Sequence, residues 1–297
     1  RENSRTFTVV GEDDAEYSAN FISADLIPGL FSVGDGRQVF FSKGNLWYGK
    51  LKGEDAAAFH LETKQYEITP PSPSAYDSTL ISHFLWAEDA SNSMRLKFDS
   101  NWLKTDYYLF TNKDAITPSP DLTVDGQQGI WRALSGENIT ILQTITGEWE
   151  YLIDRKDKKG NALYKSLVTV CGHNHCFILL PDDWEWDAGT VGSGWQTEYN
   201  ESTTVKWSTM EAFGAVCLPA LGYREGFESS DYNTMFSYHD WVYYWASTTN
   251  LIYMNSTADC LKIDGMGNVM GFSASRGCAC PIRLVMDYQS EPVRSAH

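Results

Sequence analysis

Four side chains that can bind metals lie within six residues of the chain. The motif Cys171-Gly-His-Asn-His-Cys176 carries two thiols and two imidazoles, which are ligand types that zinc prefers. The apolar runs 166–170 and 176–180 on either side predict two strands joined by a tight turn. Alternation along a strand points neighbouring side chains to opposite faces, which does not suit a site with all four ligands in one hairpin. We therefore favour a disulfide between Cys171 and Cys176 over zinc, and free thiols over both.

A second group of reactive side chains follows directly. Residues 181–187, Pro-Asp-Asp-Trp-Glu-Trp-Asp, place four carboxylates beside two tryptophans, and glycosidases use paired carboxylates in such surroundings. Asp182 and Asp183 come immediately after an apolar run, where carboxylates commonly bond to turn or backbone amides. The structural role is therefore the favoured interpretation of these carboxylates.

The third candidate is a recognition surface. Residues 229–261 contain no Lys, Arg, Glu or Gln and are instead rich in Tyr, Trp, Asn, Ser, Thr and Asp. Rigid aromatic rings give contact area at low entropy cost, and short polar groups supply adaptable hydrogen bonds. We assign Tyr244 and Trp245 to the core. The predicted exposed contacts are Tyr238, His239, Asp240, Tyr243, Tyr253, Asn255, Ser256, Asp259 and Ser275.

Two helices are expected to help position these groups. Thr146 can cap the first helix, Glu148 and Glu150 suit its N-terminal dipole, and Trp149, Leu152 and Ile153 share a face, with Arg155 and Lys156 at the far end. Thr203 or Thr204 can cap the second helix, along which Trp207, Met210 and Phe213 follow one side until Gly214 ends it.

Strands are expected to supply the rest of the scaffold. An Asp-Gly pair at 35–36 between two apolar runs predicts a hairpin of residues 26–33 and 39–42. Further strand candidates are 83–86, 94–98, 107–110, 166–170, 176–180, 215–218 and 282–286. In the sheets, buried Trp245, Leu261, Ile263, Ile282 and Leu284 are expected to fix the register and leave the alternate side chains facing outward.

Composition excludes several classes of function. The chain has 297 residues, 39 acidic against 23 basic side chains and a net charge of -16, so it would repel nucleic acid. Its apolar runs are too short to span a bilayer, and its opening residues have no apolar stretch typical of a signal peptide. Six cysteines are an even number but far too few for a small disulfide scaffold. We expect a soluble globular protein with no nucleic-acid partner and no membrane span.

The sequence resembles a known family over residues 26 to 287. The matching pieces include Leu30–Val33, Val39–Leu46, Trp131–Leu134, Glu148–Leu152, Leu179–Trp184, Lys206–Glu211, Gly214–Ala220, Gly222–Arg224, Tyr244–Thr248 and Arg283–Val285. In this order they are similar to bacteroidete surface proteins of the major-paralogous-domain type. That group in turn is similar to the C-type lectin-like fold shared by formylglycine-generating enzymes and by variable proteins of diversity-generating retroelements.

The retroelement resemblance implies which positions vary. Such systems randomise adenines, so that Asn-type codons give Tyr, Ser, Asp, His, Cys, Gly, Thr or Ile, and the segment fits that alphabet. The family ending Arg-x-x-Gly-x-Ser-Val-Arg-Leu-Val corresponds to residues 276–285, with Ala279 in place of Gly and Pro281 in place of Ser. The resemblance adds Cys260, Gly277, Cys278 and Cys280 to the variable, ligand-binding positions. Paired thiols such as Cys278 and Cys280 can also select copper(I), as in formylglycine-generating enzymes, but here both positions match variable slots.

These observations predict an α+β protein with a C-type lectin-like fold, in which two helices pack on short antiparallel sheets. We expect an arm at 1–25 and a domain at 26–290, with an insertion at 50–128 and a variable ligand-binding region at 229–285. The expected function is non-enzymatic binding of a protein or glycan on a cell surface, without a cofactor, from an extracellular, cell-surface or virion location. The alternatives are a metal-dependent enzyme on the same fold and a structural adhesin subunit.

Overall fold

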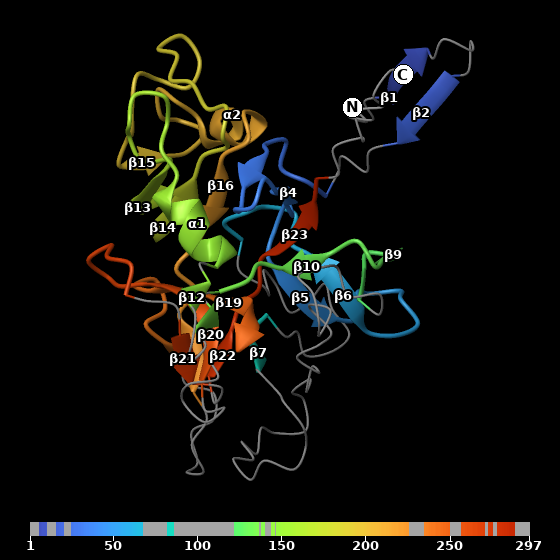
Figure 1. The fold of residues 1–297 in the computed structure, drawn as a ribbon. Helices are drawn as coiled ribbons and strands as arrows, with labels where there is room; N and C mark the ends of the chain where they lie inside the picture. The colour runs from blue at the N-terminus through green and yellow to red at the C-terminus, as the bar shows by residue number, and fades with distance from the viewer. Residues whose placement is uncertain are drawn as a thin grey trace.

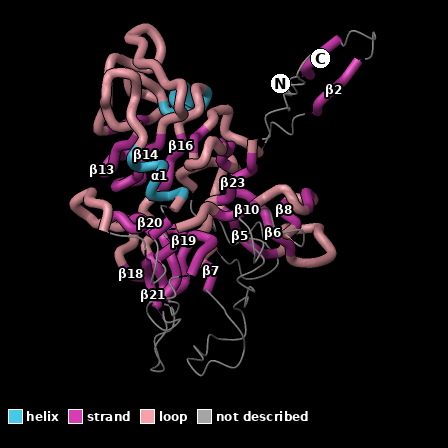
Figure 2. The backbone as a smooth tube through the Cα atoms, in the orientation of Figure 1, coloured by secondary structure: helices cyan, strands magenta, loops and turns pink. Residues whose placement is uncertain are grey.

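The computed structural model describes most of the domain. The described residues are 6–10, 16–20, 25–67, 82–85, 122–136, 138–139, 144–145, 147–225, 235–249, 257–270, 273–275 and 278–288. Within them the chain forms two short helices and several small sheets, so the structure is a mixed α+β arrangement dominated by strands and loops (Figures 1 and 2). None of the described helices is long and apolar enough to cross a membrane.

One four-stranded sheet joins the beginning and the end of the domain. Its strands are β3 (Phe31–Ser32), β4 (Gln38–Phe41), β10 (Arg132–Ala133) and β23 (Leu284–Asp287), in the order β10-β23-β4-β3. The predicted hairpin is confirmed, because β3 and β4 pair antiparallel around the Gly34–Gly36 turn. The last strand, β23, lies beside β4 and pairs with it antiparallel.

A second sheet carries the Cys171–Cys176 hairpin. It contains β13 (Tyr164–Val170), β14 (His173–Leu179), β15 (Glu198–Tyr199) and β16 (Val216–Leu218), in the order β15-β13-β14-β16. The strands expected at 166–170, 176–180 and 215–218 are therefore present. The register of β13 against β14 shifts twice, and such bulges bend a strand and redirect its side chains.

The two helices begin later than the sequence suggested. The first, α1 (Glu148–Asp154), has Gly147 at its N-cap, and the second, α2 (Trp207–Ala212), has Lys206 there; neither N-cap side chain makes a capping bond. Thr146 lies outside the described residues. The Thr203 hydroxyl lies at hydrogen-bond distance from the backbone carbonyls of Asn200 and Val205 instead, so the prediction of a Thr203 or Thr204 cap is wrong.

The ends of the helices follow the prediction in part. Trp149, Leu152, Trp207 and Met210 are buried, but Phe213 is 53% exposed and does not belong to the buried face of α2. Phe213 is the C-cap residue, where the helical direction is already lost. Gly214 ends α2 as expected, with a φ of +96° that favours glycine.

The predicted recognition region forms two sheets. One has β18 (Met235–Phe236), β17 (Tyr223–Glu225), β22 (Cys278–Cys280) and β7 (Phe84–Leu85) in that order, and the other has β19 (Val242–Thr249), β20 (Thr257–Ile263) and β21 (Ser273–Ser275). β7 corresponds to the strand candidate at 83–86. The candidates at 94–98 and 107–110 lie outside the described residues.

The remaining strands form smaller pieces. β5 (Leu46–Gly49), β6 (Ala58–Leu61), β8 (Thr123–Val124) and β9 (Gln127–Gln128) make a sheet in the order β5-β6-β8-β9, most of it drawn from the expected 50–128 insertion. Two separate pairs are β1 (Thr6–Val10) with β2 (Glu16–Asn20), and β11 (Asn138–Ile139) with β12 (Thr144–Ile145).

Two hydrophobic cores lie on opposite faces of β19. Val242, Tyr244 and Ala246 belong to the first core, together with Trp149 from α1. Tyr243 and Trp245 belong to the second core, which also includes residues of β5, β6, β10 and β22. The alternate residues of β19 therefore pack into two different interiors, and the strand is buried on both sides.

Candidate ligand-binding surface

The described contact residues lie in the turn of residues 237–241 and in the strands β19, β20, β21 and β22. The far end, as we define it, is where β19 ends at Thr249 and β20 begins at Thr257, which pairs with Ser275. Cys278 at the start of β22 pairs there with Glu225, the end of β17. These strand ends flank residues 226–234, 250–256 and 276–277. The opposite end, between β18 and β19, carries the turn of residues 237–241.

Several predicted contacts lie beyond what the structure describes. Tyr253, Asn255, Ser256 and Gly277 lie outside the described residues. Ser275 is the last residue of β21, where its backbone pairs with β20. Exposure of these side chains stays a prediction.

Four predicted contacts are buried, and their assignment to an exposed surface is wrong. Tyr243 is 6% exposed, and Cys260, Cys278 and Cys280 are also buried in the second core. The prediction assumed that one face of β19 and β20 meets solvent, whereas cores cover both faces. Burial raises the pKa of each of the Tyr243, Cys260 and Cys280 side chains far above its ordinary value.

Asp259 is also buried rather than exposed. Its Oδ2 accepts a hydrogen bond of 2.6 Å from the Thr248 hydroxyl, whose oxygen accepts one from the Gly136 amide. A Cβ added at Gly136 would come 2.3 Å from the Asp259 Cβ, so this glycine permits a close approach of the two segments. Asp259 therefore ties β19 and β20 to the segment that leads into α1.

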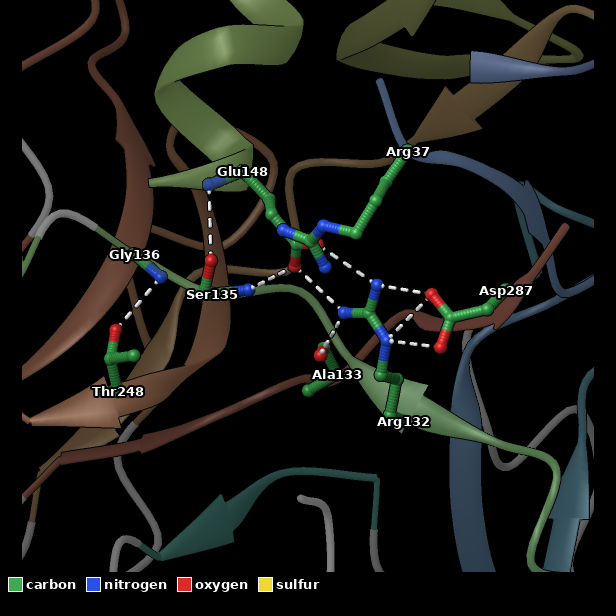
Figure 3. Close-up of polar contacts among 8 residues, drawn as sticks. All are labelled: Arg37, Arg132, Ala133, Ser135, Gly136, Glu148, Thr248 and Asp287. Carbon is green, nitrogen blue, oxygen red and sulfur yellow. Dashed lines mark hydrogen bonds and ion pairs between the residues drawn. The ribbon is translucent and has the colours of Figure 1, made fainter. Parts of the chain in front are cut away.

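A buried ionic network continues from that segment (Figure 3). Arg132 donates to both carboxylate oxygens of Glu148, at 2.7 and 2.9 Å, and also to Asp287. Arg37 reaches the same Glu148 at 2.9 Å, and the Ser135 amide donates to it at 2.8 Å. Burial disfavours the charge on Arg132, but Asp287 and Glu148 outweigh it and raise its pKa. The network joins α1, β10 and β23.

The turn of residues 237–241 presents its side chains to solvent on a fixed backbone. Tyr238 is 38% exposed, and His239 and Asp240 are exposed as predicted. Ser237 and His239 have φ values of 53° and 62°, a region that is uncommon for residues other than glycine. The His239 amide donates to the Ala220 carbonyl, and the amides of Asp240 and Trp241 donate to Ser237. These bonds hold the turn in its left-handed conformation.

Four rings from three parts of the chain form a row beside this turn. Tyr238 and His239 have ring centroids 3.9 Å apart, His239 and His173 are 6.3 Å apart, and His173 and Tyr66 are 5.7 Å apart. We call Tyr66, His173, His239 and Tyr238 the ring row. Burial and the neighbouring His239 lower the pKa of His173, and a lowered pKa keeps the imidazole neutral at pH 7. The Nδ1 of His173 has no hydrogen-bond partner.

The surface extends from the turn to the connection after β20. His175 Nδ1 lies 3.2 Å from the carboxylate and 3.2 Å from the carbonyl oxygen of Asp240. A Cβ added at Gly265 would come 2.2 Å from Asp240 Oδ1, so this glycine lets the two turns pack. Met266, next to it, is 76% exposed. The His175 imidazole and the Asp240 carboxylate therefore lie together beside the turn that carries Tyr238 and His239.

The Cys171–Cys176 hairpin contains neither a disulfide nor a group of three metal ligands. All six cysteines are free thiols in the structure, including Cys171 and Cys176. Among the described residues, no group of three or more His, Cys, Asp or Glu side chains is arranged to hold a metal ion. His173 instead joins the ring row, and His175 contacts Asp240.

The structural interpretation of Asp182 is confirmed. Its Oδ2 accepts bonds from the Ser32 backbone amide, the Ser32 hydroxyl and the Gln38 side-chain amide, and its Oδ1 accepts one of 2.6 Å from Arg155. Burial alone would raise the pKa of Asp182, but these donors outweigh burial and lower it. The carboxylate fastens the β3–β4 hairpin to the end of β14.

Sequence reasoning missed two members of the ring row. Tyr66 lies more than a hundred residues before the other three, and no local pattern connects it to them. The sequence indicates His173 only as a candidate zinc ligand, because its contact with His239 depends on tertiary packing. Comparisons with protein-family models, with curated proteins and with solved structures found no match to this chain.

Proposed function

We propose that this protein is a non-enzymatic ligand-binding protein that contacts its target through the ring row and the turn beside it. The observation that carries the proposal is the ring row itself, because four rings from three parts of the chain lie next to one another in succession. Two of them, Tyr238 and His239, are exposed on a turn with a fixed backbone. A rigid aromatic surface binds with little loss of conformational entropy.

The chemistry of this surface suits a protein or glycan on a cell surface. Ring faces can stack on sugar rings or on side chains of a protein target, and Tyr and His carry polar groups for hydrogen bonds. The buried arginines bind carboxylates of the same fold and not the ring row: Arg132 binds Glu148 and Asp287, and Arg155 binds Asp182. These pairs join elements of the fold, which favours a structural role for them over a catalytic one.

The proposal also includes a specific fold and a genetic origin. The resemblance implies a C-type lectin-like domain and a variable protein of a diversity-generating retroelement, in an extracellular, cell-surface or virion location. Two helices beside small antiparallel sheets support the fold, as does the burial of Trp245, Leu261 and Ile263. We assign variation to turn residues such as Tyr238, and not to Tyr243. A nearby reverse transcriptase gene and a near-copy of the coding sequence, differing only at adenines, would support the origin.

Binding can be tested with single substitutions at the surface. Fluorescently labelled protein would be applied to a glycan array and to intact bacterial cells, followed by titration on every positive target. Tyr238→Ala and His239→Ala are expected to weaken binding by about 1–3 kcal/mol, or roughly 5- to 150-fold. The matched control is Tyr288→Ala, which removes a tyrosine of similar exposure, 40% against 38%, from the end of β23.

The Tyr288→Ala control shows whether loss of binding is specific to the ring row or follows from the loss of any exposed tyrosine. Equal binding of all three variants and the wild type would contradict the assignment of the surface. Absence of saturable binding to any array glycan or cell type would contradict the proposed function itself. Circular dichroism and urea unfolding would establish that each variant is folded.

A further inference from the structure

The imidazole of His60 lies between two turns that border a concave surface of the sheet β5-β6-β8-β9. This surface has a volume of about 610 Å³, and His60, Glu54 and Asp125 all line it. Glu54 is in the turn between β5 and β6, and Asp125 is in the turn between β8 and β9. His60 is on β6, which pairs with both β5 and β8 (Figure 1). One side chain is thus placed to contact both turns.

His60 contacts a carboxylate from each turn. Its Nδ1 lies 2.8 Å from Asp125 Oδ1, and its Nε2 lies 3.4 Å from Glu54 Oε2. The side chain is 7% exposed, and its ring stacks on Trp47 of β5 with ring centroids 4.3 Å apart. The backbone of Gly49 accepts a further hydrogen bond from the ring. Two carboxylates and a backbone acceptor around one imidazole suit its charged form, in which both nitrogens are donors.

Both carboxylates are also held by backbone amides. The second oxygen of Asp125 accepts a bond of 2.9 Å from the Leu61 amide, directly beside His60 on β6. Glu54 Oε2 accepts a bond of 2.8 Å from the Leu51 amide, and the Glu54 amide donates back to the Leu51 carbonyl. Asp125 is therefore bonded to β6 by a backbone group as well as by His60, whereas these backbone bonds of Glu54 lie within its own turn. The contact with His60 joins the Glu54 side chain to β6.

The pKa of His60 depends on these contacts. Burial lowers it, but the hydrogen bond from Asp125 and the charges of Asp125 and Glu54 outweigh burial and raise the pKa above 6.5. Because the pKa is raised, the stabilisation from the charged ring is complete below pH 6.5 and is lost as the pH rises through the raised value. The two contacts are therefore strong in mild acid and weaken in alkaline solution.

We propose that His60 is a pH-dependent link between the β5–β6 turn and the β8–β9 turn at the edge of the concave surface. With the ring charged, Glu54 and Asp125 are bound to the same cation. When the ring loses its proton to water, the remaining proton stays on Nδ1 beside Asp125, and Nε2 has only a lone pair to present to Glu54. The Glu54 contact is therefore the one that opens, and residues 50–57 are the segment that it releases.

The test is a titration of the full-length protein between pH 5 and 9. The NMR signal of the His60 ring, identified by its loss in His60→Gln, is expected to titrate with a pKa above 6.5. Glu54→Gln and Asp125→Asn are each expected to lower this pKa, and Asp125→Asn more strongly because its contact is shorter. Amide hydrogen exchange, corrected for the intrinsic rate at each pH, is expected to show protection of residues 50–57 falling at least about threefold through the same range.

The turn of residues 157–161 provides the matched control within the same chain. Asp157 closes this exposed turn by accepting bonds of 2.8 Å from the amides of Lys159 and Asn161, and the turn contains no histidine. Bonds from the Asn161 side chain and backbone lower the pKa of Asp157, so it stays charged from pH 5 to 9. Its corrected protection is therefore expected to stay constant.

The Glu54→Gln variant decides the role of the second contact. It is expected to abolish the change at residues 50–57, because a neutral amide gives the charged ring no partner. Constant protection of residues 50–57 in the wild type, an equal change in both turns, or a His60 pKa at or below 6.5 each overturns the proposal. Glu54 has a 33% exposed side chain, so this variant keeps the test open if Asp125→Asn does not fold. None of these measurements involves the cell-surface target, so their failure leaves the proposed function untouched.

Discussion

Tyr238 and Tyr243 are five residues apart, and their environments differ completely. Tyr238 is 38% exposed on a turn, whereas Tyr243 is 6% exposed. The Tyr243 ring packs against Tyr223 with centroids 4.8 Å apart and lies under the Lys262 ammonium at 5.6 Å. Residue type alone could not separate the two, because tyrosine suits both a core and a contact surface.

This difference predicts opposite results for the same substitution. Tyr243→Ala is expected to lower the free energy of unfolding by about 3–5 kcal/mol, since it leaves a large cavity in the second core. Tyr238→Ala is expected to lower it by less than about 1 kcal/mol. Urea unfolding of both variants followed by circular dichroism measures this. A Tyr243→Ala protein as stable as the wild type would show that the ring is not packed as described.

At the scale of elements, the sequence predicted the positions of the strands better than it predicted which strand faces are buried or how the helices are capped. The hairpins at 31–42 and 164–179 follow from turn residues between apolar runs, which are local signals. The exposure of β19 was predicted wrongly, because alternation indicates one covered face, and only tertiary structure places a second core on the other. The helix caps were missed because side chains well before each helix serve these ends: the Ser135 hydroxyl accepts from the Glu148 amide, and the Glu201 carboxylate accepts from the Ser208 amide.

Asp182 shows how one carboxylate joins elements that are distant in sequence, and it predicts a pH dependence. Asp182→Asn is expected to destabilise the protein by about 2 kcal/mol at pH 7, because bonds from Ser32 and Arg155 lose a charged acceptor. Its pKa in the folded protein is lowered from 3.8, so its contribution is complete above pH 3.8 and is lost as the pH falls through the lowered value.

Unfolding of wild type and Asp182→Asn between pH 2 and 7 would therefore show a difference that shrinks with acidification. Asp183→Asn is the control, because this neighbouring carboxylate is exposed. A difference that stayed constant down to the lowest pH would mean that the charge of Asp182 is not what joins the hairpin to β14.

At the scale of the whole molecule, the Arg132–Glu148–Asp287 network connects residues from the middle and the end of the chain. Glu148 is 1% exposed and also receives Arg37 from the first hairpin. The sequence predicts Glu148 only as a favourable charge at a helix N-terminus, since no local pattern shows that two arginines converge on it. The same limitation hid Tyr66 from the predicted site.

Removal of this charge is expected to weaken the whole fold. Glu148→Gln should lower the free energy of unfolding by about 3–5 kcal/mol, because buried arginines lose their partner. Glu185→Gln, which removes the partner of exposed Lys158 at 2.9 Å, should produce no measurable change. Thermal unfolding of both variants provides the comparison, and equal midpoints would contradict a structural role for the network.

The pairing of β23 with β4 has a practical consequence for protein engineering. Asp25 is hydrogen-bonded to Lys43 just after β4, and Tyr288 is bonded to Gln38 at its beginning, so the segment from 25 to 288 starts and finishes within the length of a single short strand. A unit whose entry and exit points are neighbours can be grafted into a surface loop of a host protein without stretching the host. Such a chimera would display the ring row at a chosen site on an unrelated carrier.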